Sequence, residues 1–141
     1  MEENFNNGLQ SKKILLVEDE SFLANLLSDY IKEQGVSLEQ ASTGEECLAK
    51  AKSSKPDIIL LDIILPGIDG YEVLKQLKAN PELSKIPVIF LSNLGGKEEI
   101  DRGLELGAAD YLVKSSLVME EIIKKIKEIL QKAADSNVKS Q

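Results

Sequence analysis

The chain of 141 residues contains no histidine, and this absence excludes several kinds of chemistry. Histidine is the side chain that titrates near neutral pH, and it is central to serine–histidine triads and to many transition-metal sites. Any chemistry of this protein must therefore depend on carboxylates, hydroxyls, lysines or a hard metal ion.

Cysteine occurs only once, at Cys47. The chain can therefore form neither an intrachain disulfide nor a cysteine metal cluster. Leu48 and Ala51 accompany Cys47 at helical spacing. We expect Cys47 to be a small buried hydrophobic residue of a helix.

Arginine also occurs only once, at Arg102, and the 24 acidic residues outnumber the 17 basic ones. The formal net charge is −7. Nucleic-acid binding depends on cations that neutralise phosphates, so this composition argues against a nucleic-acid partner.

Long apolar runs are absent too, and residues 1–10 lack the basic start and apolar stretch of a signal peptide. We therefore expect no membrane association and a cytoplasmic location. With 43% apolar and 29% charged residues, the composition is typical of a globular domain. We expect a disordered arm at residues 1–10, one domain at 11–133, and a polar tail at 134–141 that is too short for an output domain.

Short apolar runs alternate with segments of helical periodicity along the chain. The runs at 14–17, 58–61 and 88–91 are apolar on both faces, 36–41 alternates, and 111–113 is short. Apolar residues recur at helical spacing in five segments, at 22–31, 43–55, 71–77, about 97–106 and 118–130. Five strand–helix repeats predict an α/β fold, with a doubly wound, five-stranded parallel sheet covered by helices on both faces.

Two local signals mark helix ends. Thr43 and Glu46 form a capping-box pattern, in which each side chain can satisfy a backbone donor of the other residue. Gly107 follows the helix at about 97–106 and is suited to a left-handed cap.

Polar residues follow four of the buried strands. Glu18 and Asp19 end the first strand, Asp62 the third, Ser92 the fourth and Lys114 the fifth. The carboxyl ends of parallel strands share one edge of the sheet, where ligands bind, so these side chains are expected to lie together.

Three crowded carboxylates repel one another unless a cation lies among them, and an all-oxygen site suits Mg²⁺. A cation, a hydroxyl and a lysine are the groups that stabilise a transferring phosphoryl group. Asp62, at the centre of this edge, is the best-placed acceptor, and the product would be an acyl phosphate.

The sequence resembles the receiver domain of two-component response regulators over residues 12–132. The motifs that carry the resemblance lie at 14–20, 57–70, 88–92 and 107–114. The resemblance implies a flavodoxin-like (βα)5 receiver fold with strand order 2-1-3-4-5. It also implies that Asp62 accepts a phosphoryl group from a histidine kinase or phosphotransfer protein.

The resemblance assigns the other site residues as well. Glu18 and Asp19, with Asp62 and the backbone carbonyl of Ile64, would bind Mg²⁺. Ser92 and Lys114 would each contact a phosphoryl oxygen. Tyr111 would be the switch aromatic, which turns inward as the hydroxyl residue moves towards the phosphate. The surface of the helix at about 97–106, the strand at 111–113 and the last helix would then signal to a partner.

Several positions depart from the common pattern of this family. Ser92 replaces the usual threonine but keeps the hydroxyl, whereas Asn93 replaces a small residue and could narrow access to the acceptor. Ser115 replaces the usual proline after the lysine, so a trans peptide bond or strain is expected there, because a cis bond without proline costs roughly 2.5–4 kcal/mol. Ile64 and Leu94 occupy positions that are often polar, and we hypothesise that they give a long-lived phosphoryl group.

Blander interpretations exist for single residues. The acids of residues 18–20 could simply favour the start of the next helix. Tyr111 could be a half-buried packing residue, and the lysines of the last helix a solvated face. These interpretations do not readily explain why all of the site residues fall at the same edge of the sheet.

The favoured function is a single-domain response regulator that catalyses only its own phosphorylation and dephosphorylation and is otherwise not an enzyme. Its partners would be a kinase or phosphotransfer protein and a separate effector, with a phosphorylation-dependent homodimer as a further hypothesis. The alternative is a degenerate receiver that binds protein without phosphorylation, for which the site is too complete. An aspartyl-phosphate phosphatase would need a carboxylate at the position of Ile64, and a flavin protein would need hydroxyl residues at 18–20. The sequence does not choose a kinase, a signal or a target.

Overall fold

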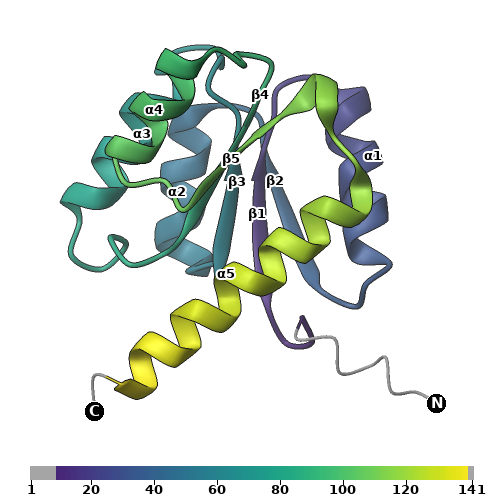
Figure 1. Cartoon of the computed structure of the whole chain (residues 1–141), viewed down its shortest axis with the longest axis vertical. Coiled ribbons are helices and arrows are strands. Elements are labelled where there is room, and N and C mark those ends of the chain that lie inside the picture. Colours follow the sequence, from purple (N-terminus) through teal and green to yellow (C-terminus); the bar gives the residue numbers. More distant parts are fainter. Residues whose placement is uncertain (1–8, 140–141) are drawn as a thin grey trace.

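The apolar runs of the sequence form the strands of one parallel sheet, and the periodic segments form helices on its two faces (Figure 1). The computed structural model describes residues 9–139. The strands are β1 (Lys13–Val17), β2 (Ser37–Ala41), β3 (Ile58–Leu61), β4 (Val88–Ser92) and β5 (Asp110–Val113). The helices are α1 (Ser21–Lys32), α2 (Gly44–Ser54), α3 (Gly70–Ala79), α4 (Lys97–Glu105) and α5 (Met119–Lys139), with a short 3-10 turn at Lys114–Ser116.

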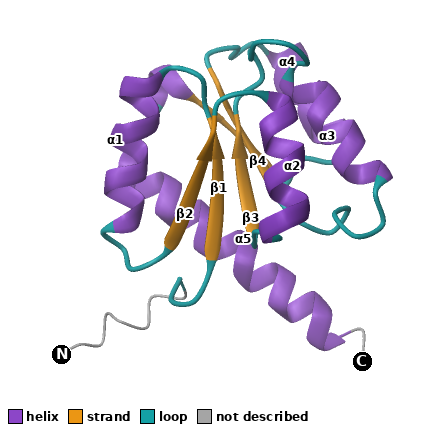
Figure 2. Cartoon of the chain, turned by 180° about the vertical axis from the view of Figure 1, so that it is seen from behind, coloured by secondary structure: helices purple, strands orange, loops and turns teal. Residues whose placement is uncertain are grey.

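The strand order is β2-β1-β3-β4-β5, and every pair is parallel. This confirms the predicted fold class and strand order. The strands of Figure 2 all point the same way, so their carboxyl ends lie along a single edge. At that edge Val17, the last residue of β1, pairs with Ala41 and Leu61 on its two neighbours.

The sheet separates two apolar cores. Successive side chains of a strand point to opposite faces, so Ile14 and Leu16 pack with α1 and α5, whereas Leu15 and Val17 pack with α2 and α3. β1, β3 and β4 carry apolar residues on both faces because helices cover both, and this is why these runs lack alternation. β2, at an edge, alternates between exposed and partly buried residues as expected.

The predicted capping box is half correct. The Thr43 hydroxyl accepts a hydrogen bond from the Glu46 backbone N–H at 3.0 Å. The Glu46 carboxylate, however, accepts from the N–H of Ser42 at 2.8 Å instead of that of Thr43. Thr43 is nevertheless the N-cap, and α2 begins at the expected place.

Two other local predictions can be compared with the backbone. Gly107 has φ of 110°, which agrees with the left-handed conformation expected after α4. No peptide bond among residues 9–139 is cis, so the bond between Lys114 and Ser115 is trans. The 3-10 turn at Lys114–Ser116 then leads the chain to α5.

The ends of the domain differ in detail from the expected boundaries. Leu9 falls in the arm that the sequence predicts to be disordered. In the structure it is fully buried, in the same core as Ile14 and Ile31. Residues 1–8 lie outside the described residues. Helix α5 continues to Lys139, into the segment expected to be a polar tail. None of the described helices is long and apolar enough to cross a membrane.

Candidate functional site

The polar residues that follow the strands line one open cleft at the carboxyl edge of the sheet. Its volume is about 340 Å³. The parallel strands all end at this edge, and β1, β3, β4 and β5 each place a polar residue from their carboxyl end in the cleft. The lining comprises Glu18, Asp19, Glu20, Leu23, Asp62, Ile64, Ser92, Asn93 and Lys114.

Three carboxylates meet in this cleft. Glu18 and Asp62 are buried, with 3% and 5% exposure, and Asp19 is exposed. One oxygen from each of the three lies within 4.8 Å of the others. The predicted convergence of these side chains is therefore present in the structure.

Lys114 joins the two buried carboxylates. Its Nζ lies 2.6 Å from Glu18 Oε1 and donates a hydrogen bond of 2.9 Å to Asp62 Oδ2. The carboxylate of Asp62 is therefore in direct contact with an ammonium group.

The charges of this cluster affect one another's protonation. Burial raises the pKa of Glu18, against the opposing effects of Lys114 and the Glu20 N–H, and the charge of Asp62 adds to the rise. Burial alone would lower the pKa of Lys114, but its contacts with Glu18 and Asp62 outweigh burial and raise it. The cluster thus favours a protonated Lys114, and burial makes Glu18 easier to protonate than a free glutamate.

The backbone fixes Asp62 at the end of β3. Its N–H donates to the carbonyl of Val17 at 3.0 Å, and its Oδ1 accepts from the N–H of Ile64 at 3.3 Å. Gly70 lies against it, because a Cβ added there would collide with the Asp62 carbonyl oxygen. The Gly70 N–H donates to the carbonyl of Ile63 at 2.7 Å, so the loop from β3 to α3 folds tightly back on Asp62.

Ser92 lies at the other side of the cleft and is fully buried. Its Oγ accepts a hydrogen bond from the Leu94 N–H at 3.2 Å, so it is tied to the loop before α4. Asn93 and Ile64 are exposed at the mouth of the cleft, with Ile64 60% exposed. Asn93 therefore borders the route to Asp62, as the sequence suggested.

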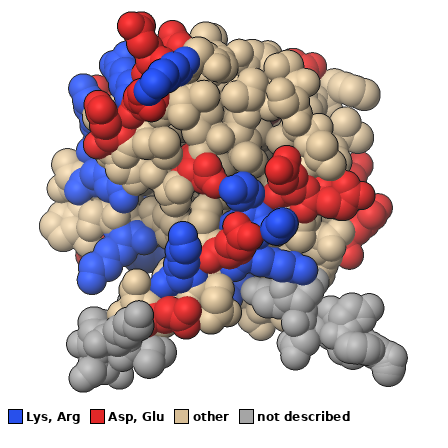
Figure 3. Space-filling model, viewed as in Figure 1, with Lys and Arg blue, Asp and Glu red and all other residues tan. Residues whose placement is uncertain are grey.

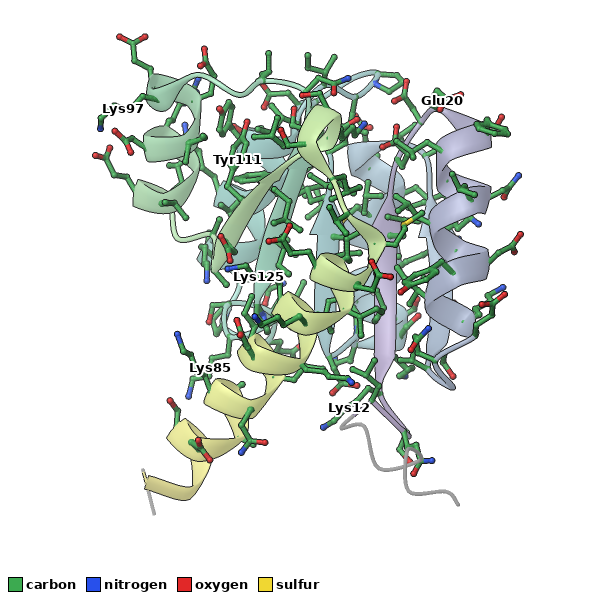
Figure 4. All side chains as sticks on the ribbon, turned by 45° about the vertical axis from the view of Figure 1, so that its right-hand side comes forward. Lys12, Glu20, Lys85, Lys97, Tyr111 and Lys125 are labelled. Atoms are coloured by element: carbon green, nitrogen blue, oxygen red, sulfur yellow. The ribbon has the colours of Figure 1, made fainter. Side chains whose placement is uncertain are left out.

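Tyr111 points into the protein on the α4 side of the sheet (Figure 4). It is 8% exposed, and its hydroxyl donates to the carbonyl of Leu94. Burial raises the pKa of Tyr111, and a hydrogen bond with the Ser92 side chain opposes this rise. Ser92 and Tyr111 are thus both connected to the loop between β4 and α4.

The residues fit a hard divalent cation. Glu18 is buried and contributes a carboxylate to the cleft beside Lys114. Together with oxygens of Asp19 and Asp62, it offers an all-oxygen set of the kind that Mg²⁺ prefers. The exposure of Asp19 leaves room for water ligands on the open side.

The lysines of α5 do not form a uniform basic patch. Figure 3 shows acidic and basic side chains interspersed on the face that carries α5. Lys125, for example, lies 3.3 Å from Asp110 on β5. This agrees with a solvated face of mixed charge.

Three features of the cleft were expected from the sequence only in part or not at all. Glu20 caps α1, since its carboxylate accepts from the Leu23 N–H at 3.0 Å, and the bland interpretation of the acidic run is therefore correct for this residue. Leu23 lines the cleft from the first turn of α1. The direct contact of Glu18 with Lys114 was also not foreseen, because sequence spacing carries no information on such pairs.

The parallel sheet and its acidic cleft together define a receiver-type signalling domain. Residues 14–127 match the response regulator receiver domain, and the chain belongs to this family. It is 41% identical over 125 residues to the alkaline phosphatase synthesis transcriptional regulatory protein PhoP of Bacillus subtilis (strain 168), covering 87% of this chain and 50% of that protein.

Solved structures agree with this membership. A two-component response regulator from Clostridium difficile has a TM-score of 0.80 and 30% identity, over 86% of this chain and 97% of that one. The Mn²⁺-bound form of another response regulator has a TM-score of 0.70 and 31% identity, over 84% of this chain and 91% of that one. The chain spans half or less of the length of the first curated relatives that it matches, so that similarity concerns their receiver portions.

Proposed function

We propose that the protein is a response regulator that accepts a phosphoryl group on Asp62. The observation that carries this proposal is the position of Asp62 in an open cleft, in contact with Lys114 and close to the other two carboxylates. An Asp62 oxygen would attack phosphorus, forming a P–O bond as the bond from phosphorus to the donor breaks. The donor keeps the electron pair of that bond, and the product is an acyl phosphate.

Each neighbour has a role in this proposal. Lys114 neutralises charge on a phosphoryl oxygen and keeps the Asp62 carboxylate oriented. Ser92 donates its hydroxyl to another phosphoryl oxygen. Glu18, Asp19, Asp62 and the backbone carbonyl of Ile64 would hold Mg²⁺, which when bound neutralises phosphoryl charge. The metal-bound relative in manganese form is consistent with a divalent ion at this edge.

The donor would be a histidine kinase or a histidine phosphotransfer protein, since receivers are partners of such proteins. The protein would catalyse only its own phosphorylation and dephosphorylation, as a regulatory phosphoacceptor. A cytoplasmic location stays a prediction.

The output of the proposed switch is the surface of α4, β5 and α5. Movement of Ser92 towards the phosphoryl group would draw the loop that bears Leu94, and Tyr111 would follow because its hydroxyl bonds Leu94. A separate effector would recognise the changed surface. A phosphorylation-dependent homodimer through this surface is a further possibility, and sedimentation of the phosphorylated form as a monomer at all concentrations would rule it out.

Incubation with acetyl phosphate, followed by intact-mass measurement, tests the proposal. With Mg²⁺, the protein is expected to gain one phosphoryl group, and Asp62→Asn is expected to gain none. Tight Mg²⁺ binding without a mass gain would indicate a donor of narrow specificity or access restricted by Asn93. Neither Mg²⁺ binding nor a mass gain would favour the degenerate receiver instead.

The exposed Ile64 and the half-buried Leu94 predict slow loss of the phosphoryl group, because apolar side chains cannot orient an attacking water. The double variant Ile64→Asn, Leu94→Glu is expected to lose the group faster than the unmodified protein. An equal or slower rate in the variant would contradict this hypothesis.

A further inference from the structure

Two buried tyrosines hold the start of α4, and only Tyr111 belongs to the site described above. Tyr111 bonds the carbonyl of Leu94, just before the helix. Tyr71, in the first turn of α3, is 5% exposed and donates its hydroxyl to the carbonyl of Glu99 at 3.1 Å. Glu99 lies in the first turn of α4, so phenol groups from β5 and α3 hold the two sides of the helix start.

Helix α4 has few other anchors besides Ile100, a partly buried residue that packs against the core. It is nine residues long, and Gly103 is its one buried residue. Its N-cap is Gly96, which has no side chain to satisfy the free N–H groups of the first turn. The position of the helix start therefore depends strongly on contacts from neighbouring elements.

The two tyrosines belong to a continuous aromatic row. The Tyr71 ring meets Phe90 edge-on, with centroids 5.5 Å apart, and Phe90 lies 5.9 Å from Tyr111. Helix α4 rests directly on this row, because a Cβ added at Gly103 would lie 2.8 Å from Phe90 and 3.2 Å from Tyr111. The position of α4 and the inward orientation of Tyr111 are therefore coupled through packing.

Arg102 adds a second link between α4 and Tyr71. Its guanidinium lies 4.0 Å from the centre of the Tyr71 ring, within the range of a cation–π interaction. Burial raises the pKa of Tyr71, and the charge of Arg102 opposes this rise. The phenol stays protonated at neutral pH and so remains a hydrogen-bond donor to Glu99.

We propose that Tyr71 is a positioning residue of the switch, which holds α4 through Glu99 and Arg102 in the arrangement that keeps Tyr111 inward. This inference rests on the proposed function, because the inward arrangement is the one that phosphorylation would favour. An interaction made in only one of two arrangements changes the affinity for any ligand that prefers that arrangement. Loss of one hydrogen bond should therefore weaken the response to the phosphoryl group roughly 2- to 10-fold.

The test uses beryllofluoride with Mg²⁺ as a phosphoryl analogue and the full chain labelled with 3-fluorotyrosine. Fluorine NMR of the Tyr111 signal gives the beryllofluoride concentration at half-conversion. Tyr71→Phe keeps the ring and removes only the hydroxyl, and it is expected to raise this concentration roughly 2- to 10-fold. Tyr30→Phe is the matched control, since Tyr30 packs on the opposite face of the sheet with α1, and no change is expected.

Arg102→Gln provides a second variant at an exposed position, with a shift in the same direction expected. If the unmodified protein responds to beryllofluoride and both Tyr71→Phe and Arg102→Gln respond at the same concentration, the role of Tyr71 is overturned. The proposed switch itself would then still stand. An unmodified protein whose Tyr111 signal does not respond would overturn the proposed switch, and this inference with it.

Discussion

Lys114 lies between two buried carboxylates, and replacing it with methionine measures how far the cluster depends on its charge. The side chains of Glu18 and Asp62 are 1% and 6% exposed, and that of Lys114 is 12% exposed. Lys114→Met keeps the aliphatic stem and removes the ammonium group. Two buried negative charges then remain without their cation.

Removing one partner of a buried ion pair costs about 3–5 kcal/mol. The lower part of this range is expected here, because the cleft is open and Glu18 can take up a proton. With a urea slope of about 1–3 kcal/mol per M, the unfolding midpoint at pH 7 should fall by roughly 1–3 M. If Mg²⁺ binds the folded carboxylates as proposed, it should restore part of the loss.

The deficit of Lys114→Met should depend on pH with a defined sign. Because burial raises the pKa of Glu18, the folded protein binds its proton more readily than the unfolded chain does. Lowering the pH through that raised pKa removes one of the uncompensated charges. The deficit should therefore shrink as the pH falls from about 7 to about 5.

Lys97→Met is the matched control in urea unfolding followed by circular dichroism. Lys97 Nζ also lies 2.6 Å from a carboxylate, that of Asp101, but its side chain is 88% exposed. Water and salt screen such a pair, so the urea midpoint should hardly change. Equal losses in the two variants, or a Lys114→Met deficit that is constant with pH, would refute the reasoning.

Three other outcomes are expected. Leu9→Ala should destabilise the domain by about 2–5 kcal/mol in urea unfolding, since Leu9 is fully buried, and a loss below the error of the measurement would contradict its role in the core. Cys47 is fully buried, and burial raises the pKa of its thiol to about 12, so a thiol reagent should react only as the protein unfolds; rapid labelling of the native protein would be inconsistent with this burial. Because the pKa of Lys114 is raised in the folded protein, its ion pairs stabilise the fold fully below the ordinary pKa of 10.5 and are lost as the pH rises through the higher folded value. The urea midpoint of the unmodified protein should therefore fall in that alkaline range, and this fall should be absent in Lys114→Met.

The arrangement of strands and helices was predictable because it follows from periodicity. The runs at 58–61 and 88–91 are apolar at every position, which only a strand covered on both faces requires. The polar residues after each strand then had to lie at one edge, and the structure brings Glu18, Asp62 and Lys114 together there. The roles assigned to these residues in phosphoryl transfer stay predictions.

Other features depend on tertiary contacts that periodicity does not encode. Leu9 is a single apolar residue in a polar stretch, and only the turn that follows it places it beneath the sheet. The Glu46 carboxylate accepts from the N–H and hydroxyl of Ser42, a choice of donor that the sequence pattern does not specify. The hydrogen bond from Tyr71 to Glu99 joins residues that are 28 positions apart in the chain, so no local pattern predicts it.

Chemical trapping of the phosphorylated residue tests directly whether Asp62 is the phosphoacceptor. Borohydride reduces an acyl phosphate of aspartate to homoserine, and peptide sequencing by mass spectrometry then locates the modified residue. After treatment with acetyl phosphate and Mg²⁺, we expect homoserine at position 62 and at no other aspartate position. Homoserine at Asp19, or phosphorylation that persists in Asp62→Asn, would contradict it.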